Sequence, residues 1–204
     1  MSLTKLDIKT LLHAYCNGYF PMPDPTTEEI RWYHPEPRAV LPLNEMHISR
    51  SLKRAIRRGG YEVTFNKSFL GVMQGCADRK DTWINQEFLR AYGELHRLGL
   101  AHSVEISHGD ALSGGLYGVA IGGAFFAESK FHRVTDASKL ALFHLVQQLK
   151  ADGFHLLEVQ FMTPHLRSLG VVEVSGDAYR EQLAHALGLS CRFGGIALDA
   201  RALI

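Results

Sequence analysis

Three apolar segments in direct succession constrain the fold of this chain more than any other feature. Residues 101–107, 111–121 and 124–129 have the length of strands and are rich in apolar side chains. Gly109-Asp110 separates the first two segments and Gly122-Gly123 the last two, and such dipeptides are typical of tight hairpin turns. The sequence therefore predicts two consecutive hairpins, which together form an antiparallel meander at the centre of the fold.

Segments with helical spacing of apolar residues flank this meander. The expected helices cover residues 6–18, 49–58, 68–77, 86–99, 137–153 and 177–188, with a helical turn at 164–170. Short strands are expected at 61–65 and 155–160. Asp136 is expected to cap the helix after the meander, because Asp is a favoured N-cap residue. We thus expect an α/β (α+β) fold in which helices flank a mostly antiparallel central sheet.

The first 37 residues are expected to form a small lobe. The stretch 19–30 contains three prolines and is expected to be a loop, while residues 30–43 predict two short strands joined by a proline turn. We place the boundary near Pro37, which divides the chain into a lobe at 1–37 and a main domain at 38–204. The tail after Gly188 has no clear pattern and receives no predicted role.

Composition excludes several classes of protein. No apolar run approaches the roughly 18 residues that span a bilayer, and the polar start carries no signal-peptide core, so we expect a cytoplasmic protein with no membrane partner. Cys16, Cys76 and Cys191 stand alone, and the histidines form no HExxH motif. Neither a disulfide framework nor a metal site is expected.

A run of basic residues at 50–58 is a candidate phosphate-binding face. Arg50, Lys53, Arg54 and Arg57 fall at i, i+3, i+4 and i+7 of a helix beginning near Ser49, and no acid compensates them. A solvated helix face is the alternative interpretation. Like charges at i,i+4 repel and cost stability without a partner, which favours nucleic acid, although the pattern does not distinguish DNA from RNA.

The order of the expected elements resembles the GNAT fold of N-acyltransferases. In acetyl-CoA enzymes a glycine-containing loop opens the helix after the meander and binds the pyrophosphate. Residues 131–140 contain no glycine. The acyl donor is therefore expected to be something other than coenzyme A.

Eight short motifs narrow the interpretation. They read, in chain order, LLHAYCNGYFPM, WYHPEPRAVLPL, HISRSLKR, DTWI, AYGELHRLGLAHSVE, GGLYGVAIGGAFFAES, ASKLAL and HLRSLG. In order and near spacing, over about residues 11–180, they are similar to those of the bacterial leucyl/phenylalanyl-tRNA–protein transferase family. The resemblance implies an aminoacyltransferase that moves leucine or phenylalanine from charged tRNA to the N-terminal α-amino group of proteins beginning with Arg or Lys. It further implies N-degron degradation of those proteins, a monomer, and no metal or nucleotide cofactor.

The residues are compatible with that chemistry. An aminoacyl ester is already activated, and the attacking α-amine has a pKa near 8, so aiming the amine and accepting its proton are the main requirements. A covalent nucleophile is unnecessary. The sequence accordingly contains no GxSxG elbow, and no Cys is paired by motif with a His.

The resemblance also implies roles for particular side chains. The walls of the donor side-chain pocket fall on five apolar residues: Leu116, Phe125, Leu145, Leu149 and Leu157. The aromatic residues near the 3′-terminal adenosine or the aminoacyl group fall on Trp83, Tyr92 and, more loosely, Tyr15. The tRNA-binding basic cluster falls on Arg50, Arg54, Arg57 and Arg58. Without the resemblance, the apolar set is equally what an ordinary core contains.

Three polar residues are expected to act on the acceptor. Glu158 and Gln160 lie two apart in an expected strand, hence on one face, so the carboxylate can hold the Gln160 amide while its carbonyl accepts a hydrogen bond from the amine. The alternative is an edge strand whose polar side chains face water. Glu128, flanked by apolar residues, is the expected contact for the cationic acceptor side chain, because an unpaired buried charge is costly.

Departures from the family pattern concern the same region. The family commonly reads ESMF where this chain has ESKF, so Lys130 is expected to share a strand face with Glu128 and to neutralise it. Alternatives therefore stay open: a changed acceptor, such as Asp or Glu N-termini, a tRNA-binding protein without transfer activity, or an acyltransferase with another donor.

Overall fold

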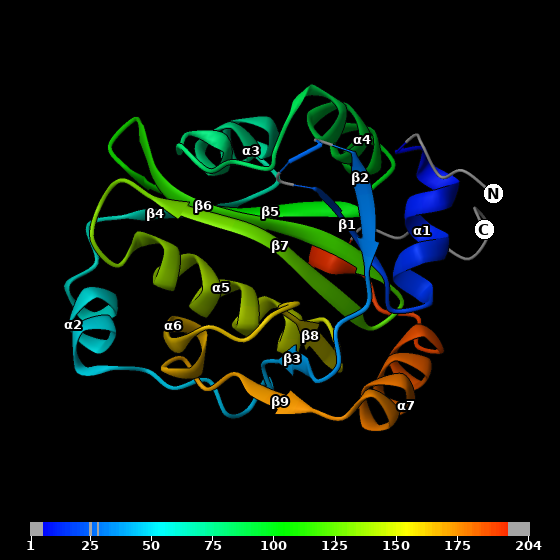
Figure 1. Cartoon of the computed structure of the whole chain (residues 1–204). Helices are drawn as coiled ribbons and strands as arrows, with labels where there is room; N and C mark the ends of the chain where they lie inside the picture. The colour runs from blue at the N-terminus through cyan, green and yellow to red at the C-terminus, as the bar shows by residue number, and fades with distance from the viewer. Residues whose placement is uncertain (1–5, 25, 28, 196–204) are drawn as a thin grey trace.

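The central sheet has the predicted meander as its core. The computed structural model describes residues 6–24, 26–27 and 29–195. Its seven-stranded sheet has the order β4-β5-β6-β7-β8-β3-β9 (Figure 1). The strands are β3 (Arg38–Val40), β4 (Glu62–Phe65), β5 (Ala101–His108), β6 (Ala111–Ile121), β7 (Ala124–His132), β8 (Leu156–Glu158) and β9 (Val172–Val174). All neighbours pair antiparallel except β7 and β8, which are parallel.

Helices cover both faces of this sheet, as predicted. Its α+β arrangement consists of α1 (Ile8–Cys16), α2 (Arg50–Arg58), α3 (Phe69–Ala77), α4 (Gln86–Arg97), α5 (Ala137–Ala151), α6 (Pro164–Arg167) and α7 (Gly176–Leu187). Figure 1 shows α3 and α4 on one face, and α2, α5 and α6 on the other. Alternate side chains of β7 enter two apolar clusters: Phe126 packs with Tyr92 on the α4 face, and Phe125 with Leu145 on the α5 face.

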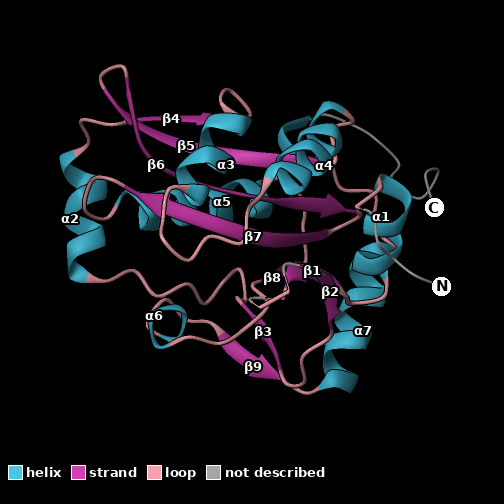
Figure 2. Cartoon of the chain, turned by 45° about the horizontal axis from the view of Figure 1, so that its top comes forward, coloured by secondary structure: helices cyan, strands magenta, loops and turns pink. Residues whose placement is uncertain are grey.

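The N-terminal segment shares the core of the sheet. Its helix α1 contributes Leu11 and Tyr15 to the apolar cluster that contains Phe88 of α4. Next to α1 lies an antiparallel ribbon of β1 (Phe20–Pro23) and β2 (Ile30–Tyr33) (Figure 2). The loop predicted over 19–30 is therefore wrong for β1, because both strands of a two-stranded ribbon have a free edge where proline leaves no partner unsatisfied. The division at Pro37 stays a prediction.

Two local predictions differ from the structure, and one strand was not predicted. The strand expected over 155–160 ends at Glu158, because Gln160 has a φ of 67° that leaves the extended region. Asp136 precedes α5 but has a φ of 67° and makes no side-chain cap; its carboxylate instead lies 2.8 Å from Nζ of Lys139. Strand β9 was not predicted, since three residues carry too little pattern.

The part of the chain that the structure describes contains neither a membrane-spanning helix nor a cluster of metal ligands. No helix there is long and apolar enough to cross a bilayer. No group of three or more His, Cys, Asp or Glu side chains is positioned to hold a metal ion. Of the tail, Phe193 is buried against Phe125 with ring centroids 5.6 Å apart, and residues 196–204 lie outside the described region.

Candidate functional site

A β-bulge in β7 determines where its polar side chains point. Tyr117 pairs with Ser129 and Gly118 pairs with Ala127, so Glu128 is the extra residue on β7. Glu128 faces α1 and α4, whereas Lys130 lies on the α5 face near Lys139. The expectation that Glu128 and Lys130 share a face is wrong, because the bulge changes the alternation of side chains between them.

Glu128 closes a ring of hydrogen bonds with two tyrosines. Its Oε1 lies 2.7 Å from the Tyr15 hydroxyl and its Oε2 3.2 Å from the Tyr92 hydroxyl, and the two hydroxyl oxygens are 2.5 Å apart. Three oxygen–oxygen contacts require three protons, and two tyrosines supply only two. The third proton therefore belongs to the Glu128 carboxyl group. Burial raises the pKa of Glu128 to about 8, in agreement with this count.

Gln160 is fixed by two glutamates. Its side-chain Nε2 donates to Oε1 of Glu128 over 3.2 Å, and its backbone N–H donates to Oε1 of Glu158 over 2.6 Å. The expected relay is corrected in one respect: Glu158 holds the backbone of Gln160 and Glu128 holds its amide, because β8 ends before Gln160. The amide oxygen of Gln160 has no hydrogen-bond partner among the described residues and is left as a free acceptor.

Arg38 completes the site and was missed by the sequence analysis. Its Nη1 lies 3.0 Å from Oε1 of Glu158, and each side chain is 1% exposed. Burial raises the pKa of Glu158, and the guanidinium of Arg38 opposes that rise. Arg38 also donates to the carbonyl of Gly18 and stacks 4.4 Å from the ring centroid of Tyr179. The signal available in the sequence was a single arginine at the start of an apolar strand.

The interior position of β8 explains why this pair is buried. Strand β8 lies between β7 and β3, so the alternative of an edge strand facing water is wrong. It pairs with β7 only from Ala124 to Phe126, after which β7 continues to His132 while β8 ends. The two parallel strands therefore part at Glu158, and Gln160 lies at the point of divergence.

An aromatic cleft lies beside the ribbon of β1 and β2. It has a volume of about 580 Å³ and is walled by Trp83, Tyr33 and Phe161, of which Phe161 directly follows Gln160 in the chain. Phe161 is 42% exposed. Tyr92 and Tyr15 are not in this cleft. Both are buried in the ring around Glu128, and neither presents a face for stacking.

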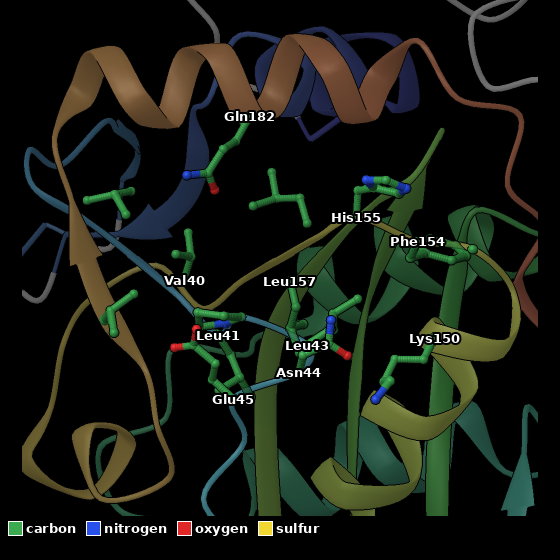
Figure 3. A pocket seen from close by; sticks show the side chains of 15 residues that line it. Val40, Leu41, Leu43, Asn44, Glu45, Lys150, Phe154, His155, Leu157 and Gln182 are labelled. Carbon is green, nitrogen blue, oxygen red and sulfur yellow. The ribbon is translucent and has the colours of Figure 1, made fainter.

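The five apolar residues expected to form the donor pocket converge on the α5 face. All belong to one cluster and are at most 2% exposed. They pack against each other and against Phe193. Leu157 also lines a separate cleft of about 550 Å³ beneath α7 (Figure 3), into which Gln182 points and whose rim carries Lys150 and His155. That cleft lies at the start of β8, away from Gln160.

The basic face of α2 is open. Leu52 and Ala55 bury one side of the helix against the α5 cluster, and Ser49 caps its start. The exposed side carries Arg50, Lys53, Arg54, Arg57 and Arg58. Within the described part of the chain, none of these side chains has a carboxylate at salt-bridge distance. Four of them are the expected tRNA contacts.

Comparison with known proteins identifies the family. The model of the leucyl/phenylalanyl-tRNA protein transferase family matches residues 40–184, and the model of that family's N-terminal domain matches residues 4–36. The chain belongs to this family. A leucyl/phenylalanyl-tRNA–protein transferase from a Ruegeria species is 53% identical over 183 residues, which are 89% of this chain and 87% of that protein. The protein of the same name from Gloeobacter violaceus is 47% identical over 191 residues, 94% of this chain and 99% of its own.

Among solved structures, a GCN5-related N-acetyltransferase from Kribbella flavida is similar at 11% identity, with a TM-score of 0.45 over 69% of this chain and 55% of its own. L-PGS from Bacillus licheniformis is similar at 14% identity, with a TM-score of 0.43 over 79% of this chain and 55% of its own.

In this transferase-family chain, the site residues therefore gather in four places. Glu128, Glu158, Gln160, Tyr15 and Tyr92 form one connected network, to which the structure adds Arg38. Trp83 lies in the aromatic cleft, which also contains Phe161, the residue after Gln160. The five apolar residues lie across the sheet, and the arginines lie on α2.

Proposed function

We propose that this chain is an aminoacyl-tRNA-dependent transferase that moves leucine or phenylalanine to the N-terminal α-amino group of proteins beginning with Arg or Lys. The observation that carries the proposal is Gln160, which two glutamates fix in a member of this family and which directly precedes Phe161 of the aromatic cleft. The protein acts in the cytoplasm as a monomer, needs no metal or nucleotide cofactor, and marks its acceptors for N-end-rule degradation.

In this proposal the donor enters through the aromatic cleft. The 3′-terminal adenine stacks on Trp83 or Phe161, a contact worth roughly 1–3 kcal/mol for a base on an aromatic ring. The ester carbonyl then reaches Gln160, the neighbour of Phe161. The leucine or phenylalanine side chain is taken up by the apolar cluster around Leu116 and Phe125. Those residues close against each other, so donor binding has to move them apart.

The chemical step needs orientation more than activation. The neutral α-amine attacks the ester carbonyl carbon, a C–N bond forms, and the C–O bond to the ribose 3′-oxygen breaks. The proton lost by the amine goes to the departing 3′-oxygen. The free amide oxygen of Gln160 accepts a hydrogen bond from the amine and aims its lone pair. Glu158 and Arg38 act as positioning residues, because they hold the left-handed backbone of Gln160.

Glu128 is assigned a positioning role here, in place of the expected contact with the cationic acceptor side chain. Its oxygens already serve two tyrosines and the amide of Gln160, and the ring leaves it uncharged. A neutral, enclosed carboxyl group is poorly suited to bind the guanidinium or ammonium group of an acceptor. We propose instead that Glu128 sets the orientation of the Gln160 amide, so that the amide oxygen faces the amine.

A transfer assay tests the proposed function. The purified protein is mixed with tRNA charged with labelled leucine or phenylalanine and with peptides that begin with Arg, Lys, Asp, Glu or Met. Label is expected in the Arg and Lys peptides only. Gln160→Leu is expected to lower kcat by at least tenfold, whereas Gln182→Leu, on α7 away from the site, serves as the matched control.

The same assay distinguishes the alternatives. Binding of charged tRNA without label in any peptide means a tRNA-binding protein that does not transfer. Label confined to Asp and Glu peptides means a changed acceptor pocket. Either outcome rules out the function proposed for this site.

A further inference from the structure

A buried cation without a partner among the described residues lies on β7, two residues after Glu128 and on the α5 face. The ammonium nitrogen of Lys130 is shielded from solvent and has no hydrogen-bond partner among the described residues. It extends from the α5 face of β7, opposite Leu116 on β6. An uncompensated charge in such a position costs several kcal/mol, and a bound anion would offset that cost.

The neighbours of Lys130 are also basic, so they add to the positive charge around its ammonium group. Lys139 on α5 is close enough to lower the pKa of Lys130, although burial is the larger cause and the two together bring it to about 8. Burial, followed by the charges of Lys130, Lys139 and His132, lowers the pKa of His165 on α6. The carboxylate of Asp136 is already paired with Lys139 at 2.8 Å.

The start of α5 adds a second feature suited to an anion. The 15-residue helix begins at Ala137 beside His132, whose Nδ1 lies 3.4 Å from the hydroxyl of Ser138. No side chain caps this helix start. The N–H groups of Ala137 and Lys139 already donate to the carbonyls of Val134 and Asp136, so the N–H of Ser138 and the partial positive charge of the helix start are what the helix offers a phosphate.

We propose that Lys130, Lys139 and His165, together with the start of α5, bind one phosphodiester at the single-stranded 3′ end of the donor tRNA. The position favours a nucleic acid over an acceptor carboxylate. The basic helix α2 packs on α5, and α2, α5 and α6 lie on the same side of the sheet (Figure 1). The site thus shares one side of the sheet with the arginine face of α2, from which a bound strand would continue along α5.

Lys130 occupies a position where the family pattern commonly has methionine, so Lys130→Met is the natural test. The inference rests on the proposed function. Two measurements distinguish a failure of the phosphate site from a failure of the proposed function. The first is binding of the deacylated trinucleotide CCA over a range of salt concentrations, which needs no transfer. The second is transfer from two donors, leucyl-tRNA and 3′-O-leucyl-adenosine, of which the latter has no phosphodiester.

Lys130→Met is expected to weaken CCA binding about tenfold and to reduce the slope of log K against log salt by about 0.7, the value for one single-strand phosphate. The KM for leucyl-tRNA should rise while the KM for leucyl-adenosine stays unchanged. Lys130→Arg, which keeps the charge, should retain most of the affinity. Lys150→Met, at the far end of α5, is the matched control and should change nothing.

Thermal unfolding supplies an independent check that both variants fold. Removing an unpaired buried charge should raise the Tm of Lys130→Met, and CCA should stabilise the wild-type chain more than this variant. Unchanged CCA binding, or an equal change for both donors, would overturn the proposal. A change confined to peptides with acidic N-termini would assign Lys130 to the acceptor instead. If the wild-type chain transfers from neither donor, the proposed function fails, and CCA binding still decides the phosphate site.

Discussion

Replacing Glu128 with glutamine distinguishes a neutral positioning residue from an anionic acceptor contact. In Glu128→Gln, the amide nitrogen donates to the Tyr92 oxygen, Tyr92 donates to Tyr15, and Tyr15 donates to the amide oxygen. The ring therefore keeps its three protons, and Gln160 keeps its acceptor. We expect this variant to fold and to retain most of its transfer activity at pH 7. A variant that folds but no longer labels Arg peptides would refute the neutral role.

The effect on stability follows from the pKa of Glu128. Its pKa is about 8 in the folded chain, against about 4.3 for an unperturbed glutamate. Between these two values the folded chain keeps a proton that the unfolded chain has released. The free energy of unfolding therefore falls as pH rises, by about 1.4 kcal/mol per pH unit from this group alone. The stabilising contribution is fully present below about pH 4.3 and is lost as pH rises through 8.

Glutamine does not titrate, so the variant should lose this dependence. Between pH 5 and pH 8, the free energy of unfolding of Glu128→Gln should rise relative to wild type by about 4 kcal/mol. Urea denaturation of both proteins at several pH values measures this difference in the free energy of unfolding. Glu181→Gln, at an exposed position on α7, is the control that should follow the wild-type curve. Parallel curves for Glu128→Gln and wild type would refute the proton count, because they would mean that Glu128 is ionised in the folded chain.

Four further predictions address other parts of the site. Arg38→Met should lower the free energy of unfolding by about 3–5 kcal/mol, since it leaves Glu158 buried without a counter-charge, and the double variant with Glu158→Gln should recover part of that loss in urea denaturation. Arg54→Ala should weaken tRNA binding and lower its salt slope by roughly one, with an unchanged preference between leucine and phenylalanine in competition assays. Trp83→Ala should raise the KM for charged tRNA by an amount equivalent to about 1–3 kcal/mol, with an unchanged KM for the peptide. Leu145→Ala should cost about 2–5 kcal/mol of stability by leaving a cavity, and a smaller loss in urea denaturation would mean that the cluster is loosely packed.

The sequence predicted elements well where local patterns determine them. The meander follows from strand-length segments and two turn dipeptides, and the basic helix from its spacing and from Ser49, which does cap it. These features depend on neighbours within a few residues. The apolar residues expected around a donor side chain also converge, because a buried helix face and a buried strand face meet wherever a helix packs on a sheet.

Features that depend on register were not predictable. The bulge at Glu128 places one additional residue on β7, and no residue type in AFFAESKF marks that position. An alternation rule applied across it assigned Lys130 to the wrong face. The left-handed conformation of Gln160 likewise arises from tertiary contacts, because its backbone N–H is held by Glu158. Rules based on sequence pattern assume regular strands, whereas the site depends on a bulge in β7 and on a left-handed residue shortly after β8.

The network also explains why the N-terminal segment matters for a site composed mainly of later residues. Tyr15 of α1 donates to Glu128, and the carbonyl of Gly18 accepts from Arg38. Both hydrogen bonds cross the boundary expected near Pro37. Without Tyr15, the ring around Glu128 lacks a proton donor. Without the Gly18 carbonyl, Arg38 keeps its ion pair with Glu158 but loses a buried hydrogen-bond acceptor. The segment before Pro37 therefore supports the residues that hold Gln160. Its removal should free the side-chain amide of Gln160 and leave the basic face of α2 unchanged.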